Sequence, residues 1–149
     1  KFVIGVMGVG GPLDKYASQR YVPIHGSFRE AMVAPASMPE FKGNVAAVRT
    51  APFWDARLQR MEDKQGKVKQ MAGFLKSKHK DHPNKDGSMD AKAQKAYLDK
   101  YRTELISGED ESYAKIARSN AAYHYFGSGK TMARIGKAFA EAMIEMSKE

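Results

Sequence analysis

The amino-acid sequence predicts an α/β fold with a parallel sheet and a helix-rich middle. Two short apolar segments, residues 2–6 and 45–50, have the composition of buried strands. Between them, a Ser-x-x-Glu capping box at Ser27 and Glu30 predicts a helix. From Trp54 onward, the apolar residues follow a helical period. Because a strand–helix–strand unit forms a parallel pair with a right-handed crossover, we expect the sheet to be parallel.

The first predicted strand runs into a glycine-rich stretch, GVMGVGGP, at residues 5–12. Glycine permits unusual backbone conformations and lets a ligand approach the main chain. The spacing is not that of a dinucleotide-binding loop, because Leu13 stands where G-x-G-x-x-G needs its third glycine. The helix that Ser27 opens is expected to run to about Ala34, since Pro35 follows.

After Trp54 the sequence predicts helices interrupted by a polar loop at residues 78–90. A short helix is expected over about 111–122, and Ser128 is expected to cap the last one. The expected inward faces of the other helices are Leu58, Met61, Val68, Ala72 and Leu75, then Tyr97, Leu98, Tyr101 and Leu105, and finally Met132, Ile135, Phe139, Met143 and Met146.

Composition narrows the class of protein. The 149 residues suffice for one domain, no apolar run approaches the roughly 20 residues of a membrane span, and the lack of cysteine excludes disulfides and thiolate chemistry. Of the net charge of +8, residues 57–80 hold eight basic residues against Glu62 and Asp63, or 8 − 2 = +6. We favour the solvated face of an amphipathic helix over a nucleic-acid surface, because few aromatic residues alternate with the lysines.

The stretch YHYFGSGKTMARIG, residues 123–136, contains the Gly-Lys-Thr ending of a phosphate-binding loop. That motif needs G-x-x-x-x-G-K-[ST], and the position of its first glycine holds His124. We therefore reject nucleotide binding and predict no cofactor. Gly127 and Gly129 are then expected to form the turn into the cap at Ser128.

His124 is the candidate catalytic residue. It stands four residues before a predicted helix N-cap, where the helix dipole disfavours imidazolium and keeps the ring in the neutral form that a general base needs. Tyr123, Tyr125 and Phe126 flank it and would shield it from water. A structural histidine within an aromatic cluster explains the same residues equally well. No serine stands in G-x-S-x-G, and Ser27 and Ser128 are expected to be helix caps.

The other histidines suggest a metal site less well. His79, Asp81, His82 and Asp86 lie close together in the sequence, within the lysine-rich polar loop. No helical or strand register aligns their side chains, so we favour a solvated loop and predict no metal.

Three segments, FVIGVMGVGG, FREAMVAPASMPEFKGNVAAVRTAPFWD and YHYFGSGKTMARIGKAFAEAM, together resemble the later part of the sialate O-acetylesterase-like carbohydrate esterases, bacterial members of the SGNH (GDSL-type) hydrolases. The resemblance covers about residues 2–56 and 120–146. It implies an α/β/α sandwich, removal of acetyl groups from carbohydrates without a metal, and a secreted or periplasmic location. It also implies a serine nucleophile and oxyanion-hole groups in an earlier segment, with His124 in the position of the late histidine base.

Two features depart from the family pattern. The nucleophile and oxyanion-hole blocks are absent, which fits a chain that starts within the domain. A missing N-terminal segment or a second chain would then complete the sheet. Ala121 stands where the family often has an aspartate that orients the histidine, so Asp110, Glu111 or Asp55 would substitute, a carbonyl would orient the ring, or the site would be inactive.

The sequence therefore predicts one SGNH-like domain over residues 1–149, with residues 57–119 as a lysine-rich helical insertion. The expected function is that of a carbohydrate O-acetylesterase-like protein, with no nucleic-acid or membrane partner. The alternative is a non-catalytic helical interaction protein whose basic helix, residues 57–80, binds an acidic partner.

Overall fold

The two predicted strands form a parallel pair. The structure is a computed structural model that describes residues 1–14 and 22–148. Strand β1 (Phe2–Val6) pairs with β2 (Val45–Arg49) in the register Phe2↔Val45 to Val6↔Arg49. The strands are short, apolar and rich in valine, as buried parallel strands are. The prediction of a parallel strand–helix–strand unit is confirmed.

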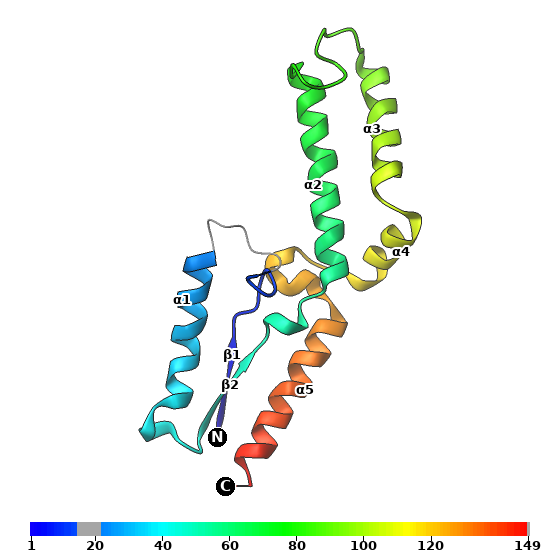
Figure 1. The fold of residues 1–149 in the computed structure, drawn as a ribbon. Coiled ribbons are helices and arrows are strands. Elements are labelled where there is room, and N and C mark those ends of the chain that lie inside the picture. Colours follow the sequence, from blue (N-terminus) through cyan, green and yellow to red (C-terminus); the bar gives the residue numbers. More distant parts are fainter. Residues whose placement is uncertain (15–21, 149) are drawn as a thin grey trace. The chain divides into compact units, whose positions relative to one another are not determined.

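Two helices pack against this sheet, and Figure 1 shows the strands between them. Helix α1 (Val22–Val33) belongs to the crossover from β1 to β2. Helix α5 (Gly129–Met146) packs against both strands, with the Phe139 ring over Gly5 of β1. The fold is thus a mixed α/β arrangement, mostly helical, with a two-stranded parallel sheet.

The prediction that Ser27 opens the first helix is wrong. Helix α1 already includes Val22, and Ser27 is exposed in its interior. Pro23 lies among the first described residues of the helix, and proline is compatible with a first helical turn, where its missing N–H costs no hydrogen bond. Glu30, the other half of the expected capping box, binds Arg49 instead.

Short 3₁₀ helices make the remaining turns of this part of the chain. They span Ala34–Ser37 (η1), Pro39–Phe41 (η2), Ala51–Phe53 (η3) and Ala122–Gly127 (η4). The first three each have proline in their opening positions, where its fixed φ favours a helical turn. Pro35 therefore ends α1 as expected, but the chain continues in a tighter turn.

The chain divides into two compact units. Unit 1 comprises Lys1–Ala56 and Ala117–Glu149, and unit 2 comprises Arg57–Ile116. Unit 1 contains the sheet, α1 and α5. The range of unit 2 lies within the 57–119 segment expected as a lysine-rich insertion. No described helix is long and apolar enough to cross a membrane.

Unit 2 is helical. It contains most of α2 (Ala56–Ser77), all of α3 (Ala91–Leu105) and nearly all of α4 (Gly108–Ala117). Leu58, Met61 and Leu75 are buried, as the predicted inward face of α2 requires. The loop between α2 and α3 is organised by Asn84, which is 2% exposed, donates to the Leu75 carbonyl and accepts from Met89 N–H.

The predicted bounds of the fourth helix, 111–122, are wrong at both ends. The Ser107 hydroxyl accepts from the N–H of Asp110, so the helix starts at Gly108. The acidic residues 109–111 then lie in its first turn, where the helix dipole favours negative charge. After Ala117 the N–H groups of Ser119 and Asn120 turn to the carbonyl of Phe126, which ends the helix.

The predicted core face of α5 is correct only in part. Met146 is buried and Phe139 is half-buried, but Met132 and Met143 are 44% and 39% exposed. The buried residue near the start of this helix is Thr131, whose hydroxyl donates to the Phe53 carbonyl. Helical spacing therefore identified the helix without identifying the full set of its buried residues.

Candidate functional site

The carboxyl ends of both strands meet at the hydroxyl of Tyr125. Its oxygen accepts a hydrogen bond from Gly8 N–H at 2.7 Å and lies 2.7 Å from Thr50 Oγ1. The Thr50 hydroxyl donates to the Val6 carbonyl at 2.8 Å, so Tyr125 must donate to Thr50. Gly8 follows β1 and Thr50 follows β2. One phenol thus links the turn that carries His124 to both strands.

Close packing at this junction requires glycine at position 8. A Cβ on Gly8 would collide with the backbone of Thr50 and Ala51 and with the Thr50 hydroxyl. Gly8 and Thr50 are both buried, so their polar groups depend on the partners just named.

The turn that carries His124 has a left-handed backbone. Tyr125, Phe126 and Gly127 all have positive φ, at 53°, 58° and 60°. Such angles cost non-glycine residues of the order of 1–2 kcal/mol each. Phe126 offsets this cost because its side chain is fully buried, its ring lies 4.9 Å from that of Trp54, and its carbonyl accepts two backbone N–H groups.

Gly127 and Ser128 play the roles that the sequence predicts for them. A Cβ on Gly127 would collide with Ser119 and Asn120, so only glycine fits this turn. The buried Ser128 side chain caps α5 by accepting from Thr131 N–H at 3.4 Å. The cap prediction for Ser128 is confirmed. Its hydroxyl is engaged as a cap in the described structure.

His124 is exposed on this turn. Its ring lies 4.5 Å from that of Tyr123, which is itself 68% exposed. The expectation that three aromatic neighbours shield His124 from water is therefore wrong, because Tyr125 points to the strand ends and Phe126 points into the core. In sequence, His124 stands five residues before the first residue of α5, and its side chain is exposed to solvent.

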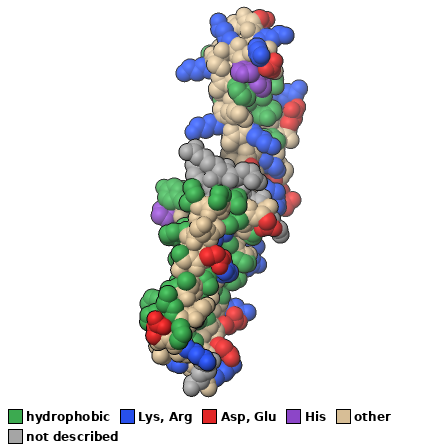
Figure 2. All heavy atoms as spheres, turned by 60° about the vertical axis from the view of Figure 1, so that its left-hand side comes forward, with side chains coloured by type: hydrophobic (Ala, Val, Ile, Leu, Met, Phe, Trp, Pro, Cys, Tyr) green, Lys and Arg blue, Asp and Glu red, His purple; other side chains and the backbone are tan. Residues whose placement is uncertain are grey.

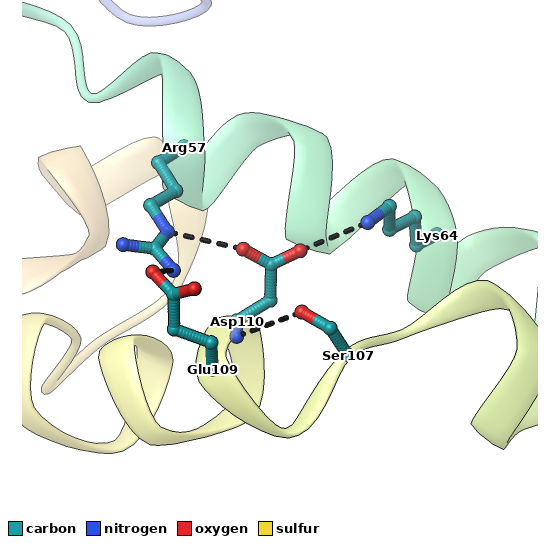
Figure 3. Close-up of polar contacts among 5 residues, drawn as sticks. All are labelled: Arg57, Lys64, Ser107, Glu109 and Asp110. Carbon is teal, nitrogen blue, oxygen red and sulfur yellow. Dashed lines mark hydrogen bonds and ion pairs between the residues drawn. The ribbon is translucent and has the colours of Figure 1, made fainter.

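The three carboxylates considered as partners of His124 have other surroundings in the described structure. Asp110 and Glu111 belong to unit 2 and bind basic side chains there. Figure 3 shows Asp110 between Arg57, at 3.0 Å, and Lys64, at 2.9 Å. Hydrogen bonds from Lys64, which has the larger effect, and from Arg57 hold the pKa of Asp110 below its usual value. Glu111 binds Arg102, and Asp55 is buried just before α2.

A cavity of about 150 Å³ lies beside the strand ends. Arg29 from α1, Arg49 from β2 and Thr50 line it, together with apolar residues: Val6, Met7, Pro12, Ala51 and Pro52. Arg29 is only 5% exposed, and it donates to the carbonyls of Gly11 and Val9 at 3.0 and 2.9 Å. It thereby fixes the glycine-rich stretch after β1.

The histidine-rich loop of unit 2 packs around an aromatic side chain. The His82 ring stacks on Phe74 at 4.1 Å, and the His79 ring lies 4.8 Å from Phe74. Within the described ranges, no group of three His, Cys, Asp or Glu side chains is placed to hold a metal ion. These two histidines instead help to pack the loop on the end of α2.

Sequence reasoning found His124 but missed Tyr125, Thr50 and Arg29. Tyr125 belongs to no sequence motif that would predict its hydrogen bonds to the strand ends. Thr50 stands at the predicted end of a strand, and Arg29 lies on the helix stripe Val22, Gly26, Arg29 and Val33. A lone arginine in a stripe of small and apolar residues was the available signal. No family model matches this chain, and no curated protein or solved structure matches it either.

Proposed function

We propose that this chain is the later part of a carbohydrate O-acetylesterase-like serine hydrolase of the SGNH type, with His124 as its general base. The observation that carries the proposal is the Tyr125 hydroxyl, which ties the His124 turn to the carboxyl ends of both parallel strands. Ligands of open α/β sheets bind outside the carboxyl ends of the strands. The three hydrogen-bonded residues, Gly8, Thr50 and Tyr125, come one from each of the sequence segments that resemble this family.

The proposed chemistry needs a neutral imidazole that faces solvent. His124 would take the proton of a serine hydroxyl as that oxygen attacks the acetyl carbonyl. The imidazolium would then protonate the leaving sugar oxygen, and a water molecule activated by His124 would release acetate from the acyl-serine. The strained backbone of this turn is typical of functional sites. The serine and the oxyanion-hole donors would come from a segment outside these 149 residues.

Further strands would complete the three-layer sandwich. Within the part of the chain that the structure describes, each strand of the sheet pairs on one side only. Of the residues in β1 and β2, only Val6 is buried. Apolar side chains are also exposed on unit 1, among them Phe2, Ile24 and Phe28 at 53–63%. Figure 2 shows hydrophobic side chains gathered over the part of the surface that α1 forms. Such surface is typical of an interface.

Hydrolysis of an acetylated sugar tests this proposal. We expect the isolated 149-residue chain to be inactive, because it lacks the nucleophile, and the full-length natural protein to be active. Hydrolysis by the pure chain that disappears on His124→Ala would refute the need for an outside serine. Absence of hydrolysis by the full-length protein on a panel of acetylated sugars would refute the esterase proposal itself.

The alternative function, binding of an acidic partner, is supported by a specific charge pattern in unit 2. Six exposed lysines around the α2–α3 connection have no ion pair in the described structure: Lys76, Lys78, Lys80, Lys85, Lys92 and Lys95. Figure 2 shows basic side chains projecting from this end. Arg57 and Lys64, by contrast, are neutralised by Glu109 and Asp110. The basic surface would therefore include the tip of the hairpin, which is the α2–α3 connection with the adjoining helix ends, and would leave out Arg57 and Lys64.

Salt dependence tests this alternative. If the tip binds a polyanion such as an acidic polysaccharide, the affinity should fall steeply as ionic strength rises, because bound counterions are released. The triple variant Lys76→Gln, Lys78→Gln, Lys80→Gln should weaken binding. A matched change of Lys137→Gln on α5, where Lys137 pairs with Glu141, should not. Equal binding by all these proteins would exclude the tip as the binding surface.

A further inference from the structure

Arg29 is a buried cation without a counter-charge. Two of its nitrogens donate to the carbonyls of Gly11 and Val9, while its Nε has no hydrogen-bond partner in the part of the chain that the structure describes. No carboxylate of residues 1–14 and 22–148 forms an ion pair with it. Buried charges in proteins are normally paired, because removing an ion from water is costly.

A second cation increases the imbalance. Arg49 lies close enough to Arg29 to act on it electrostatically, although burial is the main reason that the pKa of Arg29 is lowered. Glu30 binds Arg49 through both carboxylate oxygens at 2.8 Å. Two guanidinium groups and one carboxylate leave a net charge of +1. The exposed Glu30 carboxylate pairs with Arg49 and not with Arg29.

We propose that the cavity beside Arg29 and Arg49 binds a small carboxylate. The site lies at the carboxyl ends of the parallel strands, where ligands of such sheets bind. Arg29, Arg49 and Thr50 line it, and its volume of about 150 Å³ admits a group of only a few heavy atoms. The carboxylate supplies the negative charge that would pair with Arg29. Among cationic side chains, the planar guanidinium group of arginine is the one best suited to bind a carboxylate through two hydrogen bonds.

The walls restrict the class of carboxylate further. Val6, Met7, Pro12, Ala51 and Pro52 surround the two arginines with apolar groups. A short-chain carboxylate places its methyl end against such walls, whereas a hydrated polyhydroxy acid leaves its hydroxyl groups without partners. Acetate, the acid that the proposed esterase would release, belongs to this class. The choice of acetate as the ligand rests on that proposed function, but the carboxylate site does not.

Titrations followed by NMR of backbone amides test the site without catalysis. We expect acetate to shift the amide signals of residues 6–12 and 49–52 saturably. Acetamide has the same shape without the charge and should shift them far less. Glucuronate and inorganic phosphate are the comparison anions. Binding of phosphate or glucuronate without binding of acetate would overturn the assignment to a short-chain carboxylate, and binding of none of the four would overturn the site.

Two variants separate a specific site from general charge attraction. Arg29→Met should weaken acetate binding about tenfold or more, through loss of a charge-assisted hydrogen bond. Glu30→Gln, at an exposed position, should strengthen it about two- to fivefold, because Arg49 loses its competing carboxylate. Glu30→Gln leaves the buried Arg29 in place, so it tests the site even if Arg29→Met fails to fold. Acetate binding that Glu30→Gln leaves unchanged or weakens contradicts the proposal.

The outcome is independent of the test for hydrolysis. Saturable acetate binding with an inactive full-length protein would preserve the carboxylate site and refute the esterase. Hydrolysis by the full-length protein without acetate binding at these residues would support the esterase and refute the carboxylate site.

Discussion

At the scale of single residues, the hydroxyl of Tyr125 is the group on which the candidate site depends. It accepts from Gly8 and donates to Thr50, whose own proton goes to the Val6 carbonyl. Each donor in this series of three hydrogen bonds has an acceptor, so the polar groups of the junction are satisfied although they are largely buried. The turn is therefore fixed to the strands by a few specific bonds, and their loss should be measurable.

Removing this hydroxyl should destabilise the protein. Tyr125→Phe leaves the buried N–H of Gly8 without a partner, and we expect a loss of about 1–3 kcal/mol in the free energy of unfolding. The matched control is Tyr123→Phe, because Tyr123 is 68% exposed and its hydroxyl makes no hydrogen bond with the residues that the structure describes. Urea denaturation measures both. Equal losses for the two variants would show that the Tyr125 bonds do not hold the turn.

The left-handed turn makes a second prediction at the residue scale. Gly127→Ala forces a Cβ into Ser119 and Asn120 at a φ of +60°, and it should cost about 1–3 kcal/mol of stability. Gly136→Ala is the control, because Gly136 lies inside α5 with no atom near its Cβ. It should stabilise the helix by up to about 1 kcal/mol. Thermal unfolding that moves in the same direction for both would argue against strain at Gly127.

The sequence indicated His124 as a candidate, which stays a prediction, but the surroundings of this residue could not be predicted. A failed phosphate-binding motif and a helix cap at Ser128 drew attention to this histidine. Whether Tyr125 and Phe126 shield the ring depends on their backbone angles, and the adjacent glycine was the only local sign of a left-handed turn. The role of Tyr125 comes from contacts with Gly8 and Thr50, which are 117 and 75 residues away in sequence.

At the scale of elements, ion pairs between basic side chains on α2 and acidic side chains on α4 join these two helices. Arg57 and Lys64 on α2 bind Asp110 on α4, and Arg57 also binds Glu109 at 2.8 Å. The ring of Tyr113, on α4, lies 4.4 Å from the Arg57 guanidinium carbon. Because one carboxylate is shared by two cations, its protonation affects both bonds at once.

Acid should therefore loosen unit 2. Because the pKa of Asp110 is lower in the folded state than in the unfolded chain, its contribution to stability is present above its unfolded pKa of about 3.9. It is lost as the pH falls through the lowered folded value. Stability against urea should decline from about pH 5 downward. Asp110→Asn should lower stability at pH 7 and flatten this decline; an unchanged slope would show that Asp110 contributes nothing to it.

Helices with a clear apolar period were predictable, but their ends were not. The buried face of α2 appeared in the sequence because Leu58, Met61 and Leu75 recur at helical spacing. The capping box at Ser27 misled because Glu30 binds Arg49 instead of the helix end. The start of α4 was missed because the Ser107 hydroxyl accepts from the N–H of Asp110. Cap residues compete locally, and the sequence does not rank them.

At the scale of the whole molecule, the exposed apolar surface of unit 1 and the basic tip of unit 2 support different partners. Exposed Phe2, Ile24 and Phe28 favour further protein structure packed on the sheet and α1. The lysines around the α2–α3 connection favour a polyanion or solvent. The sequence predicted the pair of parallel strands but not how little of it would be buried, since burial depends on tertiary packing that the composition of a strand does not specify.

The central claim is that His124 acts as the base of an acetyl esterase. Its most direct test is kcat for an acetylated sugar with the full-length natural protein, comparing His124→Ala with His82→Ala, a histidine that packs on Phe74 in unit 2. We expect His124→Ala to lower kcat by about 10²–10⁴ with little change in KM, and His82→Ala to retain activity. Undiminished hydrolysis by His124→Ala would contradict the account.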